Sequence, residues 1–261
     1  MPYLFKYIVV YQGMAHPKIM GILNCTPDSF FDGGSYMREK EISERIAQMI
    51  AERTDIIDLG GESTRPGAQH VSVQDQIQRV EHAAFLLKKA GVPWSIDTAD
   101  PEVAQYLKRY DFSIINCTFY SEKMVETAAR LKKTLVVMHA RGDPKTMGSL
   151  AQYENVVQEV KSFFYDAVRT CDRYGLGDIL LDPGIGFAKD EVQNWALLNN
   201  LDEFLSLNKK ILVGASRKRF VDGSLEGSLY AHLVAAQKGA YMVRVHDVKE
   251  HRVLFEDHFR R

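Results

Sequence analysis

The 261-residue sequence lacks an excess of charge of either sign. Its 33 Lys and Arg residues balance 34 Asp and Glu residues, and the formal net charge at pH 7 is −1. Without a basic field or a basic run, the chain has no sequence signature of a protein that binds nucleic acid or a membrane surface. An anionic ligand would therefore have to be held by a local group of basic side chains.

Long apolar runs are also lacking. The longest early run, YLFKYIVVY at residues 3–11, contains Lys6 and has neither a basic leader nor a small-residue cleavage site. We interpret it as a short strand, because a signal peptide needs both of those features and a membrane span needs a much longer apolar run.

Cysteine is scarce. The three cysteines, Cys25, Cys117 and Cys171, show no metal-ligand spacing and no obvious pairing. Reduced thiols of this kind favour a cytoplasmic protein in which the cysteines serve as packing residues.

Short apolar runs alternate with longer helical patterns, and no low-complexity linker interrupts them. The runs are KIMGIL, TDIIDL, PWSID, FSIIN, TLVVM, DILLD, KKILVGAS and YMVRV, and amphipathic stretches such as residues 41–53 and 73–90 lie between them. This alternation predicts a parallel sheet. Eight βα units in roughly 250 residues are what a (β/α)8 barrel requires.

We therefore predict a single TIM-barrel domain over residues 1–261, with an N-terminal strand region at 1–18 and the barrel at 19–258. A doubly wound sheet is the competing topology. It is disfavoured because no GxGxxG fingerprint opens the first helix.

Nearly every predicted strand ends on a polar residue. The residues at these ends are Asn24, Asp58, Asp97, Asn116, Met138 with His139, Asp182, Ser216, Arg244 and His246. TIM barrels carry their sites at the C-terminal ends of the strands, so these side chains would meet at one mouth. Carboxylates and amides suit a polar heterocycle. Lys218, Arg244 and His246 suit an anion. The loop after Asn24 would close over the ligand.

Single residues at these ends have alternative explanations. Asp58, which precedes Leu-Gly-Gly, could serve only to hydrogen-bond neighbouring backbone, and His139 is expected to be a core histidine. Asp97 and Asp182 follow strongly apolar runs, where an unpaired carboxylate is costly, so a ligand donor is the expected partner.

Apart from His139, the histidines divide into His246, which lies near Arg244, and the remaining six. Arg244 and His246 lie two positions apart on a strand and share a face, which favours a phosphate-type site. The other histidines are expected at the surface: His16, His70, His82, His232, His251 and His258.

Seven segments, in the order MGILNCTPDSFFDGG, DLGGESTRPGA, SIDT, IIN, LLDPGIGF, GASRK and VRVHDV, resemble those of the dihydropteroate synthase family. The pair TPDSF and GGESTRPG is highly specific, and the match spans residues 19–250. The resemblance implies a folate-biosynthesis transferase on a (β/α)8 barrel. Such an enzyme joins 6-hydroxymethyl-7,8-dihydropterin pyrophosphate to p-aminobenzoate, releases pyrophosphate and is assisted by Mg²⁺.

The resemblance also implies a role for individual residues. The pterin pocket would consist of Asp97, Asn116, Asp182 and Lys218, with Met138 and Phe187 as apolar walls. The pyrophosphate would be bound by Asn24, Arg65, Arg244 and His246, and Mg²⁺ by Asn24 and Asp32. The p-aminobenzoate pocket would consist of Phe30, Thr64, Pro66, Phe187 and Ser216.

The implied reaction is a substitution at the pterin methylene that needs no protein nucleophile. This agrees with a sequence that has no convincing Ser-His-Asp or Cys-His arrangement, and it makes catalysis mostly electrostatic. The loops TPDSFFDGG and STRPG would then exclude water from the cationic intermediate.

Three features depart from the family pattern. Cys117 stands where an acidic residue is usual, Arg219 stands where some members carry serine, and the segment 219–227 is short. The short segment weakens the expectation of a homodimer, since family members dimerise through late helices.

Two alternatives stay open at this point. A methyltetrahydrofolate-binding methyltransferase would share the Asn-Asp-Asp pocket but would need neither the TPDSF loop nor the SRK and RVH anion site. A non-catalytic pterin-binding paralogue would be expected to lose Lys218 or the basic pair first, and this chain retains both.

Overall fold

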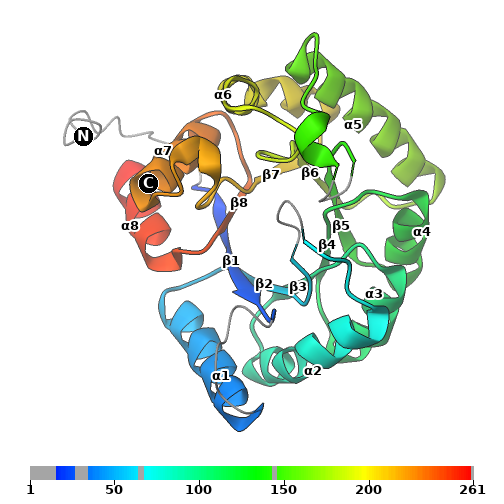
Figure 1. Ribbon diagram of the computed structural model, residues 1–261, viewed down its shortest axis with the longest axis vertical. Helices are drawn as coiled ribbons and strands as arrows, with labels where there is room; N and C mark the ends of the chain where they lie inside the picture. Colours follow the sequence, from blue (N-terminus) through cyan, green and yellow to red (C-terminus); the bar gives the residue numbers. More distant parts are fainter. Residues whose placement is uncertain (1–15, 27–34, 64–67, 143–145, 260–261) are drawn as a thin grey trace.

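The chain forms a closed barrel of eight parallel strands surrounded by helices (Figure 1). The structure is a computed structural model that describes residues 16–26, 35–63, 68–142 and 146–259. The predicted strand at 3–11 and the loop at 27–34 therefore lie outside the described residues.

The barrel strands coincide with the predicted apolar runs. They are β1 Lys18–Asn24, β2 Ile56–Gly60, β3 Trp94–Asp97, β4 Ile114–Cys117, β5 Thr134–Met138, β6 Ile179–Asp182, β7 Lys210–Val213 and β8 Met242–Val245. Each strand pairs in parallel with the next, and β8 closes the ring on β1 with Met242 beside Lys18. The prediction of a (β/α)8 barrel is confirmed, because this closure excludes an open doubly wound sheet.

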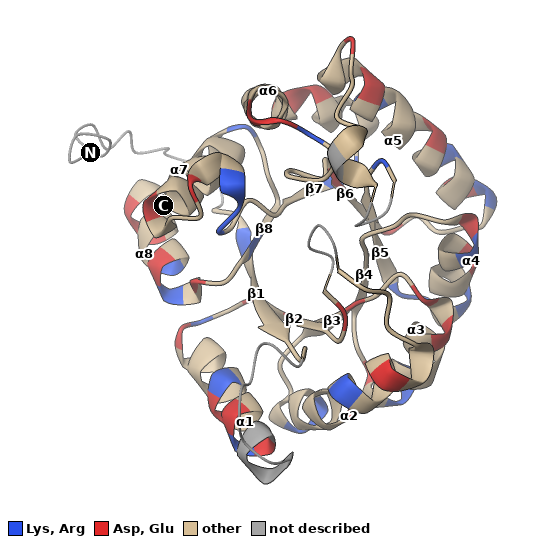
Figure 2. Cartoon of the chain, in the orientation of Figure 1, with Lys and Arg blue, Asp and Glu red and all other residues tan. Residues whose placement is uncertain are grey.

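Helices connect successive strands and pack on the outside of the barrel. They are α1 Ser35–Ala51, α2 Val73–Ala90, α3 Pro101–Leu107, α4 Glu122–Leu131, α5 Val156–Arg173, α6 Glu191–Asn199, α7 Leu225–Gln237 and α8 Val248–His258. Short 3₁₀ helices are η2 Lys108–Tyr110, η3 Met147–Ser149, η4 Leu201–Leu207 and η5 Arg219–Val221. Acidic and basic side chains are mixed along outer helices such as α5 and α8 (Figure 2), as the near-zero net charge suggests. None of the described helices is long and apolar enough to cross a membrane.

A layer of apolar side chains fills the inside of the barrel. Its members are Met20, Ile56, Ile114, Val136, Leu180, Leu212 and Met242. Strand side chains alternate between faces, so the residue two positions further along points the same way. Those following residues include Asp58, Asn116, Met138, Asp182 and Arg244. The period of two therefore places a polar layer directly above an apolar one, at the C-terminal end of the barrel.

A second apolar layer lies between the strands and the helices. Trp94 packs edge-on against Phe112 with ring centroids 5.6 Å apart, and Phe164 packs on Phe204 at 5.4 Å. All four rings are fully buried. Burial of such large apolar side chains is the main stabilising contribution to the fold, and it holds the helices on the barrel.

The expected surface position of the histidines is wrong for three of them. His232, His251 and His258 are buried on α7 and α8. Both ring nitrogens of His232 and of His251, and Nδ1 of His258, have hydrogen-bond partners. A buried imidazole is tolerated when its polar atoms are satisfied in this way. His139 is buried as expected, and the three cysteines are buried too.

Candidate active site at the barrel mouth

Asp58 lies at the centre of the polar layer and is fully buried. Its carboxylate accepts hydrogen bonds from Ser95 Oγ at 2.5 Å and from Asn116 Nδ2 at 2.9 Å. Arg244 Nε donates to the same carboxylate at 2.6 Å. The Asp58 side chain thus accepts hydrogen bonds from side chains of β3, β4 and β8. Its role is therefore not limited to hydrogen bonds with neighbouring backbone. It orients two residues to which the sequence assigns ligand contacts.

Asp97 shares the Arg244 guanidinium with Asp58. Arg244 Nη2 donates to Asp97 Oδ2 at 2.8 Å, and Thr118 Oγ1 donates to Asp97 Oδ1 at 3.1 Å. Burial raises the pKa of Asp97 to about 7, and the charge of Asp58 acts in the same direction, while Arg244 opposes both. A carboxyl group with a pKa near 7 at the mouth of a barrel is typical of a ligand-binding position.

Asp182 and Lys218 form a second group of opposite charges across the mouth. Asp182 Oδ1 accepts a hydrogen bond from the Gly184 backbone N–H at 2.8 Å. Lys218 Nζ donates to the Ile185 carbonyl and lies 4.6 Å from the centre of the Phe187 ring. Burial raises the pKa of Asp182 and lowers that of Lys218 to about 8, and each charge opposes the shift of the other.

The six predicted pterin-binding residues lie on adjoining strand ends and loops. Asp97 is the register partner of Asn116, and Met138 is the register partner of Asp182. Lys218 contacts the Phe187 ring, and its charge interacts with that of Asp182. The structure therefore brings together two acidic groups, one amide, one ammonium and two apolar surfaces, a set that matches a flat ring with both donors and acceptors.

Lys189 is a buried charge that the sequence analysis missed. Its ammonium group lies 2.9 Å from the Phe187 carbonyl, 3.0 Å from the Gly184 carbonyl and 3.1 Å from His139 Nδ1. Burial lowers the pKa of Lys189 to about 7, and burial together with the Lys189 charge lowers that of His139 to about 3. Lys189 thus holds the loop that carries Phe187 against β5.

The Lys189 contact depends on a glycine. Gly184 has a φ of +67°, and a Cβ atom at this position would lie 1.9 Å from the His139 carbonyl oxygen. Only glycine allows this loop to pass so close to the end of β5. The LLDPGIGF turn was the available sequence signal, but a lysine that follows a turn is normally exposed.

Ser216 and His246 are in direct contact at the ends of β7 and β8. Ser216 Oγ lies 3.0 Å from His246 Nδ1 and accepts from the His246 backbone N–H at 3.1 Å. Beside them, the Arg217 guanidinium binds the Asp247 carboxylate through two hydrogen bonds of 2.9 and 2.8 Å. A residue assigned to p-aminobenzoate therefore touches one assigned to pyrophosphate.

Asn24 ends β1 close to the acidic centre. A Cβ atom added at Gly60 would lie 3.3 Å from Asn24 Oδ1 and 3.6 Å from Asp97 Cβ, so the glycine leaves room for the amide beside the carboxylate. Oxygen donors of this type suit Mg²⁺, which fits the expected metal role of Asn24. The other expected site residues in the loops lie outside the described residues: Phe30, Asp32, Thr64, Arg65 and Pro66.

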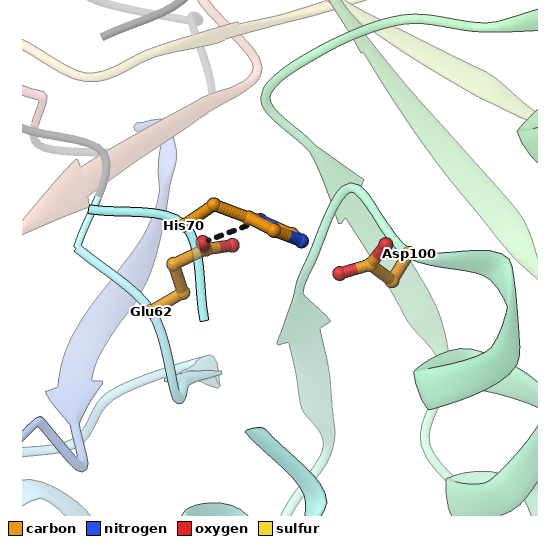
Figure 3. Close-up of side chains that lie close together, drawn as sticks. All are labelled: Glu62, His70 and Asp100. Carbon is orange, nitrogen blue, oxygen red and sulfur yellow. Dashed lines mark hydrogen bonds and ion pairs between the residues drawn. The ribbon is translucent and has the colours of Figure 1, made fainter. Parts of the chain in front are cut away.

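Glu62, His70 and Asp100 form another cluster, shown in Figure 3, whose ligand atoms lie within 4.8 Å of one another. His70 Nδ1 lies 3.0 Å from Glu62 Oε1, which also accepts from the Val71 N–H at 2.8 Å. Gln76 donates to Asp100 at 2.5 Å. One oxygen of each carboxylate thus already accepts from a protein donor, and the sequence analysis did not point to this cluster.

Two departures from the family pattern have a structural explanation. Cys117 is buried, and its Sγ lies 3.2 Å from the Phe119 carbonyl oxygen. Burial raises the pKa of the Cys117 thiol to about 12, so the residue stays protonated and serves for packing. Arg219 is exposed at the start of η5.

A parallel barrel whose C-terminal mouth gathers carboxylates, an asparagine and a lysine belongs to the class of barrel enzymes that bind a small polar ring. Residues 20–246 match the model of the pterin binding enzyme family. Dihydropteroate synthase of Escherichia coli strain K12 is 39% identical over 250 residues, which cover 91% of this chain and 89% of that protein. The Haemophilus influenzae enzyme is 36% identical over 245 residues, with 89% of each chain covered.

Solved structures give the same result. Dihydropteroate synthase from Clostridium difficile, determined in the presence of pteroic acid, has a TM-score of 0.86 and 32% identity, covering 92% of this chain and 95% of that one. The Xanthomonas albilineans enzyme with 4-aminobenzoic acid has a TM-score of 0.84 and 34% identity, covering 92% and 91%. The chain belongs to the pterin binding enzymes and, within them, to the dihydropteroate synthase family.

Proposed function

We propose that the barrel mouth condenses 6-hydroxymethyl-7,8-dihydropterin pyrophosphate with p-aminobenzoate to give 7,8-dihydropteroate and pyrophosphate. The observation that carries the proposal is the meeting of Asp97 and Asn116 with Asp182 and Lys218 at one end of the barrel. These groups offer acceptors for the amino group and ring N–H groups of a pterin and a donor for its carbonyl. The methyltransferase and non-catalytic alternatives gain no support, since the relatives reported above are synthases.

The pterin ring would lie between the two acidic groups. Burial raises the pKa of both Asp182 and Asp97, so a ligand that donates hydrogen bonds or carries positive charge would stabilise their ionised forms. Positive charge would form on the pterin when the bond between its methylene and the pyrophosphate oxygen breaks. The carboxylates would then stabilise the delocalised cation more strongly than the neutral ring, which is the source of catalysis.

The leaving group and the amine would approach from the β7, β8 and β1 ends. Arg244, His246 and Asn24 would contact the pyrophosphate, with Arg65 from the loop after β2. Ser216 would contact p-aminobenzoate, whose nitrogen forms the new bond to the methylene and loses a proton to solvent. Phe30, Thr64, Pro66 and Phe187 would complete that pocket.

We assign Mg²⁺ to Asn24 and Asp32. The amide oxygen of Asn24 at the mouth is a suitable ligand, and the charge of the ion would offset that of the departing pyrophosphate. The cysteine usage supports a cytoplasmic location. A homodimer formed through late helices stays a prediction, for which the partly exposed Tyr230 beside Trp195, with ring centroids 5.7 Å apart, offers an apolar surface on α6 and α7.

The test is pyrophosphate release after the purified chain is mixed with the pterin pyrophosphate and p-aminobenzoate. Sustained release that requires both substrates is the expected result, with 7,8-dihydropteroate identified by mass spectrometry. Binding of the pterin without turnover would instead identify a non-catalytic paralogue. Methyl transfer from methyltetrahydrofolate would identify the other class.

A further inference from the structure

Two buried histidines connect α7 to α8 behind the ends of β7 and β8. His232 on α7 and His251 on α8 are both fully buried. His232 Nδ1 lies 2.8 Å from His251 Nε2, and the ring centroids are 4.9 Å apart at an angle of 62°. The contact is therefore a direct hydrogen bond between two imidazoles, far from the surface.

Backbone groups at both ends fix the proton positions of this pair. The Ala215 N–H donates to His232 Nε2 at 2.9 Å, so this nitrogen carries no proton and Nδ1 carries it. His251 Nδ1 lies 2.7 Å from the Asp247 carbonyl, which can only accept, so Nδ1 carries the proton and Nε2 is free to accept. The shared bond must then run from His232 Nδ1–H to His251 Nε2. Three consecutive hydrogen bonds, each donated toward Asp247, therefore lead from the Ala215 N–H after β7 to the Asp247 carbonyl after β8.

Each end of this chain of bonds is one residue away from the proposed site. Ala215 precedes Ser216, and Asp247 follows His246. Ser216 Oγ and His246 Nδ1 are themselves 3.0 Å apart at the mouth. The two loops are thus joined at the mouth by Ser216 with His246 and by Arg217 with Asp247, and behind the mouth by the histidine pair. Connections on one side alone would allow the loops to pivot, whereas connections on two separated sides fix their relative orientation.

The pair is built to stay neutral. A second proton on His232 would have to sit on Nε2, against the Ala215 N–H, and a second proton on His251 would have to sit on Nε2, against the His232 N–H. The charged or titratable groups that act on the pair are Lys218, His246, Arg217, Asp247 and Glu250. Burial is the largest cause in both rings; it lowers the pKa of His232 well below its usual value and lowers that of His251.

We propose that His232 and His251 act as a positioning pair for the reaction, holding the β7 and β8 ends in the orientation that lets Ser216 and His246 act on p-aminobenzoate and pyrophosphate. This role rests on the proposed function, which assigns those two residues to the substrates. The ring nitrogens of the pair are bonded to each other and to the backbone of Ala215 and Asp247, so none is left to contact a substrate. Their effect is on geometry, through the backbone of Ala215 and Asp247.

Three variants on α8 separate positioning from packing. His251→Leu removes both hydrogen bonds of the ring at similar volume, whereas His251→Gln keeps an oxygen that can accept from His232 Nδ1–H. His258→Leu is the matched control, because His258 is buried on the same helix and its Nδ1 bonds the Leu254 carbonyl at 2.8 Å, the same contact one turn back that His251 makes. All three are assayed well below their midpoints of thermal unfolding.

We expect His251→Leu to lower kcat about tenfold or more, since small displacements of reacting groups have effects of that size. His251→Gln should retain most of the wild-type kcat. His258→Leu should keep the wild-type kcat even if its unfolding midpoint falls as far as that of His251→Leu. Equal kcat in His251→Leu and the wild-type protein would overturn the proposal. If His251→Leu does not fold, His232→Leu, which removes the shared hydrogen bond from the α7 side, is compared with His258→Leu in the same way.

The side-chain ¹⁵N signals of His246 provide a readout that does not depend on turnover. We expect His251→Leu to change the tautomer balance and titration of His246, and His258→Leu to leave both as in the wild-type protein. Unchanged His246 signals in His251→Leu would show a purely structural pair. If the wild-type protein released no pyrophosphate, the proposed function would fail, while the His246 signals would still decide whether the pair orients the loop.

Discussion

Arg244 Nη2 donates to Asp97 Oδ2 at 2.8 Å, so a guanidinium assigned to the leaving group binds a carboxylate assigned to the pterin. The same guanidinium also bonds Asp58 at 2.6 Å. Under these assignments, binding of pyrophosphate and binding of the pterin ring would be coupled through one cation. A pterin that donates to Asp97 would compete with Arg244, and pyrophosphate that attracts Arg244 would make Asp97 more available.

Arg244→Ala is expected to lower the free energy of unfolding as well as activity. The substitution leaves the carboxylates of Asp58 and Asp97 close together without their shared cation, and removing one partner of a buried ion pair typically costs about 3–5 kcal/mol. Urea unfolding at neutral pH measures the loss. Arg53→Ala is the control, because Arg53 pairs with Glu256 at 2.8 Å on the exposed surface, where such pairs contribute at most about 1 kcal/mol. Similar losses in both variants would contradict the coupled centre.

Lys189→Met should weaken both the fold and the pterin site. The Gly184 and Phe187 carbonyls would lose their buried donor, at about 1–3 kcal/mol for each unsatisfied acceptor. Because the same loop carries Phe187, the affinity for a pterin without phosphates should fall too, as calorimetry can measure. Lys161→Met removes a lysine that pairs with Glu203 near the surface and should change neither quantity. A Lys189→Met protein as stable as wild type would show that the loop does not depend on the ammonium group.

Buried neutral histidines predict acid sensitivity of the fold. The pKa values of His232 and His251 are lowered in the folded state, whereas the unfolded chain binds protons near the ordinary pKa of about 6.5. Below that pH the unfolded state binds more protons, so stability present above it is lost as pH falls, by up to about 1.4 kcal/mol per pH unit for each histidine. Replacing both by Leu should flatten the loss of stability between about pH 5 and 6.5. An equally steep loss in the double variant would assign the acid sensitivity to other groups.

Metal removal tests the assignment of Mg²⁺. Treatment with EDTA should abolish pyrophosphate release, and added Mg²⁺ should restore it. Asp32→Asn should raise the Mg²⁺ concentration needed for half-maximal rate, while Glu62→Gln should leave it unchanged. The opposite pattern would move the metal to the cluster of Glu62, His70 and Asp100.

The fold was predictable because local sequence determines it. Alternation of apolar runs and amphipathic stretches predicts a parallel sheet, and eight such units in about 250 residues favour a barrel. The period of two along a strand places Asp58 directly above Ile56. Residues at strand ends, such as Asp182, could therefore be assigned to the mouth without knowledge of their partners.

What the sequence missed depends on long-range contacts. The imidazoles of His232 and His251 meet only because α7 and α8 pack side by side, and neither helix pattern shows which ring nitrogen finds a partner. Lys189 follows a turn, so its sequence position predicts an exposed side chain. In the structure its ammonium group contacts His139 at the end of β5. Asp58 and Arg244 are 186 positions apart, so only closure of the barrel joins them.

Asp182→Asn is expected to lower activity while keeping or raising the free energy of unfolding. Burial raises the pKa of Asp182 above its usual value, so the folded state binds more protons than the unfolded state as pH rises through this range, and stability falls as the carboxyl ionises. Asparagine carries no charge and keeps an oxygen for the Gly184 N–H. The variant should therefore be at least as stable as wild type at pH 8 in urea unfolding.

The same variant should bind the pterin poorly, because an ionised acceptor is replaced by a neutral amide that also presents a donor to the ring. We expect a loss of about 2–4 kcal/mol in kcat/KM, which corresponds to a charge-assisted hydrogen bond and an unpaired ligand donor. Calorimetry with a pterin lacking phosphates measures the binding part of this loss directly. Unchanged pterin affinity in a variant of unchanged or higher stability would show that Asp182 does not contact the ring, and the acceptor role would pass to Asp97 alone. A variant that lost both affinity and stability would instead show that the carboxylate stabilises the mouth through Lys218, because that ammonium group is the strongest charge acting on it.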